Sequence, residues 1–426
     1  MVTRLFIFED DKFDQFFPLT YTRPVYDLLF GMTSTGSMIG SLFPSVQETL
    51  LCRDYMTGVL KERMGQAVYV NHLEAAADDE VLVVNGRLLP SSGLRQELGA
   101  SGEDQLLVAK GDIVGWHGGG RAFERLRGRF ERLHDKNAIT DLKSELKCVE
   151  VEAQMVRYLW DLVIRNAEVI QADFERFKRT LDSNGMFKHC EVDDQALLYE
   201  VDRVYIGKGS KIDGHVVLDA RSGPIFIGSN VHIQPFTRVE GPCFVGEGSI
   251  LVGGKIRGGT SIGPHCRMGG EVEQSIFQGY SNKYHEGFLG HSFVGEWVNL
   301  GALTTNSDLK NNYGPVKVVV NGDLVDSGET KVGAFIGDHA KTGIGTLLNT
   351  GVTIGFASNV FGGGMIKQKS IPSFFWGGAQ GGETYRLEEA IKTAEVVMQR
   401  RGKELTAANV DLFKKVFQLT DKERRE

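Results

Sequence analysis

The chain has 426 residues, 41% of them hydrophobic, and a formal net charge of −7. The length suggests two or three domains with an ordinary globular composition, and the negative charge excludes a general binder of nucleic acid or of anionic membranes. No run of about 18 apolar residues occurs, so we expect no membrane span and a cytoplasmic protein. The five cysteines lack a CxxC pair and are expected to be buried thiols in a reducing compartment.

Residues 1–195 are predicted to form an α/β domain. Short apolar runs at 5–8, 67–70, 81–84 and 106–108 are typical of strands and alternate with helical or loop segments. Helices are expected at 121–133 and 154–162. A polar helix or linker is expected at 172–184.

The string PLTYTRPVYDL, residues 18–28, is the most distinctive part of this domain. It resembles the PLTxxRPK segment of sugar-phosphate nucleotidyltransferases, and more closely the variant N-terminal domain of GlmU-like proteins. In the common family members a glycine-rich turn just upstream wraps the triphosphate with backbone N–H groups. Here Glu9, Asp10 and Asp11 occupy that place, and Val25 replaces the lysine that usually follows the Arg-Pro pair.

This departure leaves phosphate binding to side chains, and guanidinium groups suit phosphate oxygens. The candidates are Arg23, Arg53 and Arg87, although a helix-surface charge and a turn residue are equally open interpretations of the last two. Nucleotidyl transfer also implies Mg²⁺ held by carboxylates. The available aspartates form no DxD signature, so no metal ligand is assigned and a non-catalytic N-terminal domain stays an alternative. These aspartates are Asp10, Asp27, Asp112 and Asp161.

From residue 206 to residue 360 an aliphatic side chain recurs about every sixth position, often followed by glycine. A period this short predicts a β-solenoid, in which three hexads close one coil and stacked coils share a core. The predicted inward residues are Ile206, Ile212, Leu218, Ile227, Ile233, Val239, Val245, Leu251, Ile256, Ile262, Met268, Ile276, Phe288, Val294, Leu300, Ile336, Leu348, Ile354 and Val360.

The pattern resembles the left-handed parallel β-helix of the hexapeptide acyltransferases. Left-handed winding is implied by this resemblance alone, because periodicity does not determine handedness. We assign residues 196–376 to this domain. A purely structural solenoid without chemistry is the alternative.

The segment SNKYHEGFLGHSFVGEWVNLGALTTNSDLKNNYGPVKV, residues 281–318, looks like the acetyltransferase site of the bifunctional glucosamine-1-phosphate acetyltransferase and N-acetylglucosamine-1-phosphate uridyltransferase family. The resemblance places His285 at the general base, Asn299 and Asn306 at asparagines that contact amino sugar and acyl donor, and Phe288 where the family has a sugar-contacting tyrosine. The lost hydroxyl is expected to shift substrate preference. Lys283 is a candidate for the sugar phosphate.

An imidazole suits this chemistry because it can accept a proton near neutral pH while the amine attacks a thioester. Backbone N–H groups or an asparagine amide can stabilise the resulting oxyanion. His291 is the first rival to His285, and His339 is the second.

The remaining expectations concern the end of the solenoid. Residues 305–330 interrupt the hexads and are predicted to leave the coil as a loop, and the resemblance implies a trimer with sites between subunits. The acyl donor should be acetyl-CoA, with Lys367 and Lys369 as candidates for its phosphates and solvated charges as the alternative. Phe374, Phe375 and Trp376 are expected to cap the last coil. Residues 377–426 form a predicted helical tail, with a glycine hinge at 377–382 and a helix at 383–401.

The sequence therefore predicts a sugar-nucleotide enzyme. The solenoid would acetylate an amino-sugar 1-phosphate, and the N-terminal domain would join a sugar 1-phosphate to a nucleoside triphosphate, in the manner of UDP-N-acetylglucosamine synthesis. One alternative keeps nucleotidyl transfer and makes the solenoid a trimerising or regulatory scaffold. Another is a regulatory protein that binds sugar nucleotides without turnover.

Overall fold

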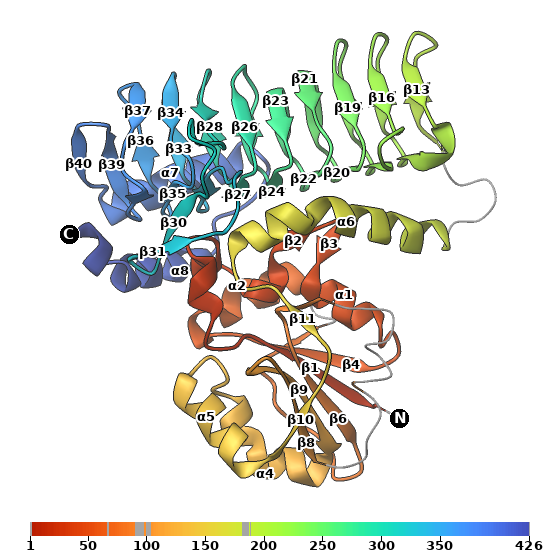
Figure 1. The fold of residues 1–426 in the computed structure, drawn as a ribbon, viewed down its shortest axis with the longest axis vertical. Helices are drawn as coiled ribbons and strands as arrows, with labels where there is room; N and C mark the ends of the chain where they lie inside the picture. The colour runs from red at the N-terminus through yellow and green to blue at the C-terminus, as the bar shows by residue number, and fades with distance from the viewer. Residues whose placement is uncertain are drawn as a thin grey trace.

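A computed structural model describes residues 2–65, 68–89, 98, 104–180, 187 and 189–425. An α/β domain and a parallel β-helix form one molecule, and the long helix α6 (Leu159–Lys178) lies between them, along one side of the β-helix (Figure 1). This arrangement confirms the predicted fold class, an α/β domain followed by a β-helix and C-terminal helices.

The N-terminal domain is a mixed sheet covered by helices on both faces. Its strand order is β10-β8-β9-β6-β1-β4-β5, in which β1 is parallel to β4 and β6 while β9 is antiparallel to β6 and β8. Phe6 and Phe8 of β1 pack towards α4 and α5, while Leu5 and Ile7 pack towards α1 and α2. The run LFIF is apolar throughout because both faces of the strand are buried.

The elements of this domain are β1 (Arg4–Phe8), β2 (Leu29–Phe30), β3 (Thr33–Ser34), α1 (Thr35–Ser41), β4 (Gln47–Leu51), α2 (Thr57–Met64), β5 (Tyr69–Val70), β6 (Glu80–Asn85), β7 (Leu88–Leu89), β8 (Gln105–Ala109), β9 (Asp112–Gly119), α4 (Gly120–Phe130), α5 (Lys136–Glu145), β10 (Lys147–Glu150) and β11 (Gln154–Met155).

The predicted helix at 154–162 is wrong in its first half. Residues 154–155 form β11, which pairs with β7, and α6 begins only at Leu159. Asp161 stabilises that start, because its carboxylate reaches back from the first turn and accepts the backbone N–H groups of Arg157 and of the N-cap residue Tyr158, as in a capping box. Ala67 of the predicted strand at 67–70, and residues 181–184 of the predicted linker, lie outside the described residues.

The β-helix consists of three parallel walls. One wall contains β14 (Val204–Ile206), β17 (Ile225–Ile227), β20 (Cys243–Val245), β22 (Thr260–Ile262), β24 (Ile276–Gly279), β27 (Phe293–Glu296), β32 (Phe335–Ile336), β35 (Thr353–Ile354) and β38 (Ser370–Ile371). The second contains β12 (Glu191–Val192), β15 (Lys211–Ile212), β18 (His232–Ile233), β21 (Ile250–Ile256), β23 (Arg267–Glu273), β25 (Asn282–Lys283), β28 (Asn299–Leu300), β33 (Lys341–Thr342), β36 (Asn359–Val360) and β39 (Phe375–Gly378). The third contains β13 (Leu197–Tyr199), β16 (Val217–Asp219), β19 (Arg238–Glu240), β26 (Phe288–Gly290), β29 (Thr305–Asn306), β34 (Thr346–Leu348) and β37 (Gly364–Ile366), with the ends of β21 and β23.

The predicted inward register holds along most of the chain but slips at two positions. Phe277 and Leu289, rather than Ile276 and Phe288, enter the interior core. Ile276 instead packs outward against the cluster that contains Trp160 of α6. The slips occur because the coils near the site are not built from strict six-residue units, so a fixed period drifts by one residue and exchanges the inner and outer faces.

Three interior positions carry polar side chains that the hexad pattern skips. Strand pairing between adjacent coils places Lys283 beside Met268, Asn306 beside Leu348, and Thr342 beside Leu300. Lys283 is 2% exposed, and its ammonium donates to the carbonyl oxygens of Gly269 and His285 at 3.1 and 2.9 Å.

The loop predicted to leave the coil at residue 305 begins later than predicted. Thr305–Asn306 still form β29 in the third wall. The chain then leaves the coil and forms a hairpin of β30 (Lys317–Val320) and β31 (Asp323–Asp326) before it returns at β32. Val316 and Val318 of this excursion are buried in the cluster shared with the N-terminal domain.

The C-terminal segment folds back onto both domains. The predicted hinge at 377–382 is wrong, because these residues belong to an antiparallel hairpin of β39 and β40 (Gly381–Thr384) that covers the edge of the last coil. Helix α7 (Leu387–Gln399) then runs beside the β-helix, and α8 (Ala407–Leu419) contacts α2. Thr406 and Asn409 donate to Glu62 of α2 at 2.8 and 3.3 Å.

All five cysteines are free thiols, but the expectation that they are buried is wrong for Cys148, which is exposed, and Cys190 is only half-buried. Within the described ranges, no helix has the length and apolar character needed to cross a membrane.

We predict that the interior lysine makes stability depend on pH. Burial lowers the pKa of Lys283 to about 8, from an ordinary 10.5. Between these values the unfolded chain binds more protons than the folded one, so the free energy of unfolding rises with pH, by at most about 1.4 kcal/mol per unit. Lys283→Met should flatten this rise in urea unfolding measured from pH 7 to pH 10.

The matched control is Lys255→Met, because the Lys255 side chain is 73% exposed on a neighbouring wall of the same β-helix. An unchanged pH slope in Lys283→Met would show that the ammonium is not held in the interior.

Candidate functional site

A cavity of about 600 Å³ lies between the β-helix wall and the end of α7. It brings together two residues predicted from the sequence, His285 and Asn299. The other lining residues are Arg267, Tyr280, Asn282, Tyr284, Trp297, Val298, Leu300, Gly301, Ala302, Lys341, Ile344, Val397, Arg400 and Arg401. Its volume is in the range of small-molecule sites.

His285 lies on the turn that follows β25 and is exposed at the cavity. Its backbone carbonyl accepts the hydrogen bond from Lys283, so the buried lysine holds the turn from below. Its ring lies edge-on to Tyr284, with ring centroids 5.4 Å apart. Within the described residues no hydrogen bond is recorded to either ring nitrogen, so the imidazole is available to a ligand.

Asn299 is oriented by a chain of amide contacts. Its Oδ1 accepts from Nδ2 of Asn282 at 3.2 Å, and Oδ1 of Asn282 accepts from Nη2 of Arg401 at 2.6 Å. Asn282 and Asn299 are neighbours because their strands pair in register. The Asn299 amide nitrogen is left to donate to a ligand.

The electrostatic character of the cavity is positive. Arg267, Lys341, Arg400 and Arg401 line it, and no carboxylate belongs to its lining among the described residues. Burial lowers the pKa of Lys341 to about 8. Burial, together with the nearby charge of Arg267, also lowers the pKa of Arg401. The cavity therefore favours an anionic ligand.

The sequence interpretation missed these cationic residues. Lys341 is strand-paired with Asn299 although 42 positions separate them, and the chain returns to Arg400 and Arg401 only after α7. A possible signal was the Arg-Arg pair at the end of an amphipathic helix, but only the path of the tail brings it to the β-helix.

The other residues predicted for acetyl transfer do not line the cavity. Asn306 is buried and bonded to the backbone N–H and C=O of Gly290 at 2.8 and 2.9 Å, which gives it a structural role inside the third wall. Phe288 is half-buried on the outer face of that wall. Lys367 is exposed, and Lys369 donates to the Thr350 carbonyl. Lys283 points into the interior, so the geometry gives no support to its contact with a sugar phosphate.

The two rival histidines are engaged elsewhere. Nδ1 of His291 lies 2.7 Å from Oδ2 of Asp308, and although burial acts to raise the pKa of Asp308, the hydrogen bond and charge of His291 lower it. His339 is buried between aromatic rings, and burial lowers its pKa to about 3. Neither lines the cavity.

The three arginines predicted to bind phosphate are all buried and paired with carboxylates. Nε of Arg53 lies 2.8 Å from Oε2 of Glu9, and Nη2 of Arg87 lies 2.5 Å from Oδ2 of Asp10. Arg23 is paired with carboxylates of the β-helix. Phosphate binding by these groups stays a prediction, and it would require buried ion pairs to open.

The aspartates considered for a metal are likewise engaged by basic side chains or by backbone N–H groups, and Asp10 and Asp112 both lie close to Arg87. Asp10 pairs with Arg87, Asp27 with Arg63, Asp112 with Lys12, and Asp161 caps α6. In the parts of the chain that the structure describes, no three acidic, histidine or cysteine residues are grouped as a metal site. These residues therefore do not fit a resident Mg²⁺ ion.

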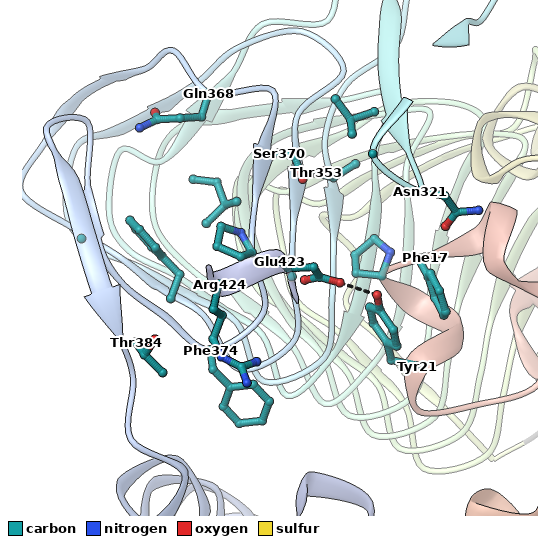
Figure 2. A pocket seen from close by; sticks show the side chains of 18 of the residues that line it. Phe17, Tyr21, Asn321, Thr353, Gln368, Ser370, Phe374, Thr384, Glu423 and Arg424 are labelled. Carbon is teal, nitrogen blue, oxygen red and sulfur yellow. Dashed lines mark hydrogen bonds between the residues drawn. The ribbon is translucent and has the colours of Figure 1, made fainter. Parts of the chain in front are cut away.

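A second cavity, of about 610 Å³, lies between the two domains (Figure 2). Phe17 and Tyr21 face Thr353 and Ser370 of the β-helix across it, and the Tyr21 hydroxyl donates to Glu423 of the C-terminal segment. Its lining contains the carboxylates of Glu383 and Glu423 and no histidine. The cavity at His285 is therefore the candidate for acyl transfer.

Sequence comparisons agree with this architecture. The family model described as sugar nucleotidyl transferase matches residues 5–181. A bifunctional sugar-1-phosphate nucleotidylyltransferase/acetyltransferase of Sulfurisphaera tokodaii is 37% identical over 98 residues, which are 23% of this chain and 24% of the relative. The bifunctional protein GlmU of Azoarcus sp. is 31% identical over 162 residues (36% and 32%), and that of Methylibium petroleiphilum 29% over 253 residues (58% and 48%).

The chain thus combines a segment similar to sugar nucleotidyl transferases with a parallel β-helix, and over part of its length it is similar to GlmU proteins. It spans between a quarter and a half of the length of these relatives. Among solved structures, the N-acyltransferase AntD of Bacillus cereus, in complex with dTDP and 3-hydroxybutyryl-CoA, is 16% identical with a TM-score of 0.20. That match covers 54% of this chain and 96% of AntD.

We predict that anion binding at this cavity weakens as Lys341 loses its proton. Since burial lowers the pKa of Lys341 to about 8, the ammonium is present at pH 7 and mostly lost at pH 9. Calorimetric titration with inorganic pyrophosphate should show affinity falling through pH 8. Lys341→Met should bind more weakly at pH 7 and lose this inflection, whereas Lys317→Met, on the hairpin strand β30, should keep it.

Proposed function

We propose that the β-helix transfers an acetyl group from acetyl-CoA to the amine of an amino-sugar 1-phosphate, with glucosamine 1-phosphate as the expected acceptor. The observation that carries the proposal is the cavity itself. It presents the imidazole of His285 and the amide of Asn299 beside four basic side chains, and among the described residues no carboxylate lines it. Both proposed substrates carry phosphate, which such a site favours.

The proposed reaction uses the side chains in distinct roles. The neutral amine attacks the thioester carbonyl while His285 accepts the proton that the nitrogen loses. The carbonyl oxygen becomes an oxyanion, which the Asn299 amide nitrogen can stabilise. The C–S bond then breaks and CoA leaves as the thiol after protonation. Arg400, Arg401 and Lys341 hold phosphate groups.

His285 is exposed in the single chain, and the cavity is open on one side. A neighbouring subunit would exclude water from the reacting groups. We therefore include in this proposal a homotrimer with its sites near the subunit contacts. The proposal also includes a cytoplasmic location.

For the N-terminal domain we propose nucleotidyl transfer from a nucleoside triphosphate to a sugar 1-phosphate, with release of pyrophosphate and with UDP-N-acetylglucosamine as the expected product. The family match over residues 5–181 supports it. Because the carboxylates present do not fit a resident metal, Mg²⁺ would be bound mainly by the substrate phosphates. The missing glycine-rich turn favours the alternative in which this domain binds a sugar nucleotide without turnover.

We expect His285→Ala to reduce kcat for thiol release from acetyl-CoA with glucosamine 1-phosphate by roughly 100-fold to 10,000-fold, the usual contribution of a general base. KM should change little, because the cationic residues remain. The control is His232→Ala, whose ring pairs with Asp213 on another coil. Equal activity of wild type and His285→Ala would contradict the assignment of the base.

We expect purified protein to release pyrophosphate from UTP and Mg²⁺ with N-acetylglucosamine 1-phosphate. Pyrophosphate without any thiol release in the other assay would make the β-helix a scaffold. Thiol release without pyrophosphate would leave the N-terminal domain as a binding domain. Absence of both, with binding of UDP-N-acetylglucosamine retained, would favour a regulatory protein.

A further inference from the structure

One buried side chain of the N-terminal domain forms ion pairs with two turns of the β-helix, here called the Glu296 and Asp338 corners, which lie at the ends of β27 and β32. Arg23, in the PLTYTRP string, has no exposed surface. Its Nη2 lies 2.5 Å from Oδ2 of Asp338 and 3.2 Å from Oε2 of Glu296. The adjacent Thr22 hydroxyl donates to the same Asp338 oxygen at 2.7 Å.

The two corners are also bonded to each other. Oδ1 of Asp338 accepts the backbone N–H of Glu296 at 2.8 Å. The Glu296 carbonyl in turn accepts the backbone N–H of His339 at 2.8 Å. Arg23, Glu296 and Asp338 are therefore one hydrogen-bonded unit, which includes adjacent coils of the β-helix and a residue of the other domain.

These corners continue directly into the cavity that contains His285. Glu296 leads through Trp297 to Asn299, and Asp338 leads through His339 to Lys341. The rings of Trp297 and His339 stack with centroids 6.2 Å apart. Both residues have positive φ angles, 61° and 60°, as residues at other corners of the β-helix also do, for example His265 and Tyr280.

We propose that Arg23 is a positioning residue for the β-helix site. It holds the Glu296 and Asp338 corners, these fix the stacked rings of Trp297 and His339, and the rings set the place of Asn299 and Lys341 in the cavity. An arginine of a nucleotidyl transferase string thus supports the proposed acyl-transfer site of the other domain. The kinetic part of this inference depends on the proposed function, but the structural part does not.

The charges around Arg23 explain why its removal would destabilise the Glu296 and Asp338 corners. Asp27 lies 4.0 Å from its Nη1, and Arg63, on α2, pairs with Asp27 and lies 3.9 Å from Glu296. Arg63 is 27% exposed, so it replaces little of the buried positive charge. Without Arg23, the carboxylates of Asp338 and Glu296 face each other in a region of low dielectric, and a buried charge without its partner is strongly unfavourable.

The first test measures hydrogen exchange by mass spectrometry on the full chain. Arg23→Met and the milder Thr22→Val should each raise amide exchange at 296–302 and 338–342, by about tenfold or more for the arginine, since bonds to charged groups are the stronger ones. Arg87→Met also loses a buried guanidinium, but one paired with Asp10 within the N-terminal domain, and Thr20→Val loses a hydroxyl bonded to the Phe13 carbonyl. Neither control should change exchange in these two segments.

The second test compares kinetic constants for acetyl transfer. Thr22→Val and Arg23→Lys should lower kcat more than they raise KM for acetyl-CoA, because Asn299 at the reacting centre is displaced, whereas Arg400 and Arg401 keep their phosphate contacts and only Lys341 moves. Arg23→Lys should retain more kcat than Arg23→Met. Should Arg23→Met fail to fold, the double variant Arg23→Met with Asp338→Asn removes the unpaired charge and should still show raised exchange.

Unchanged exchange at both segments in Thr22→Val and Arg23→Lys, in a folded protein, would overturn the inference. Raised exchange with unaltered kinetic constants would also overturn it, because the corners would then move without effect on the site. If wild-type protein shows no acetyl transfer, the proposed function fails separately, and the exchange measurement alone decides whether Arg23 holds the corners.

Discussion

The buried guanidinium of Arg23 joins the N-terminal domain to the β-helix through ion pairs. It is fully enclosed, so it requires carboxylates, and those closest to it belong to the β-helix at Asp338 and Glu296. Apolar contacts of α6 with the β-helix and contacts of α8 with α2 also join these parts of the chain. The cavity at His285 depends on the same contact, because two of its walls continue from the corners that Arg23 holds.

Ion pairs within the N-terminal domain also account for its departure from the usual nucleotidyltransferase pattern. A glycine-rich turn would offer backbone N–H groups at the end of β1, where this chain has Glu9 and Asp10. These carboxylates neutralise Arg53 and Arg87 at the carboxyl ends of the neighbouring parallel strands. In open α/β sheets ligands bind at this edge. Here the edge is closed by side chains, which is the physical reason why the β-helix supplies the better-supported site.

Some residues of the candidate site could be predicted from the sequence, and others could not. His285 and Asn299 could be predicted because a short string carries both, with a spacing that strand pairing preserves. Asn306, in the same string, has its amide engaged with Gly290. Lys341 and Arg401 lacked any local signal. They reach the cavity through a pairing across the ejected hairpin and through the return of the C-terminal helix.

The β-helix was determined by the sequence alone, because its period is local and each coil repeats the same inward aliphatic position and the same tight corner. The apolar runs of the first domain likewise predicted its α/β character. Only the tertiary structure decided which residues meet at the cavity and which charges pair. Arg23 and Asp338 are 315 positions apart, and no periodicity or propensity relates them. Their pairing depends on how the two domains pack, so it could be known only once the whole chain was folded.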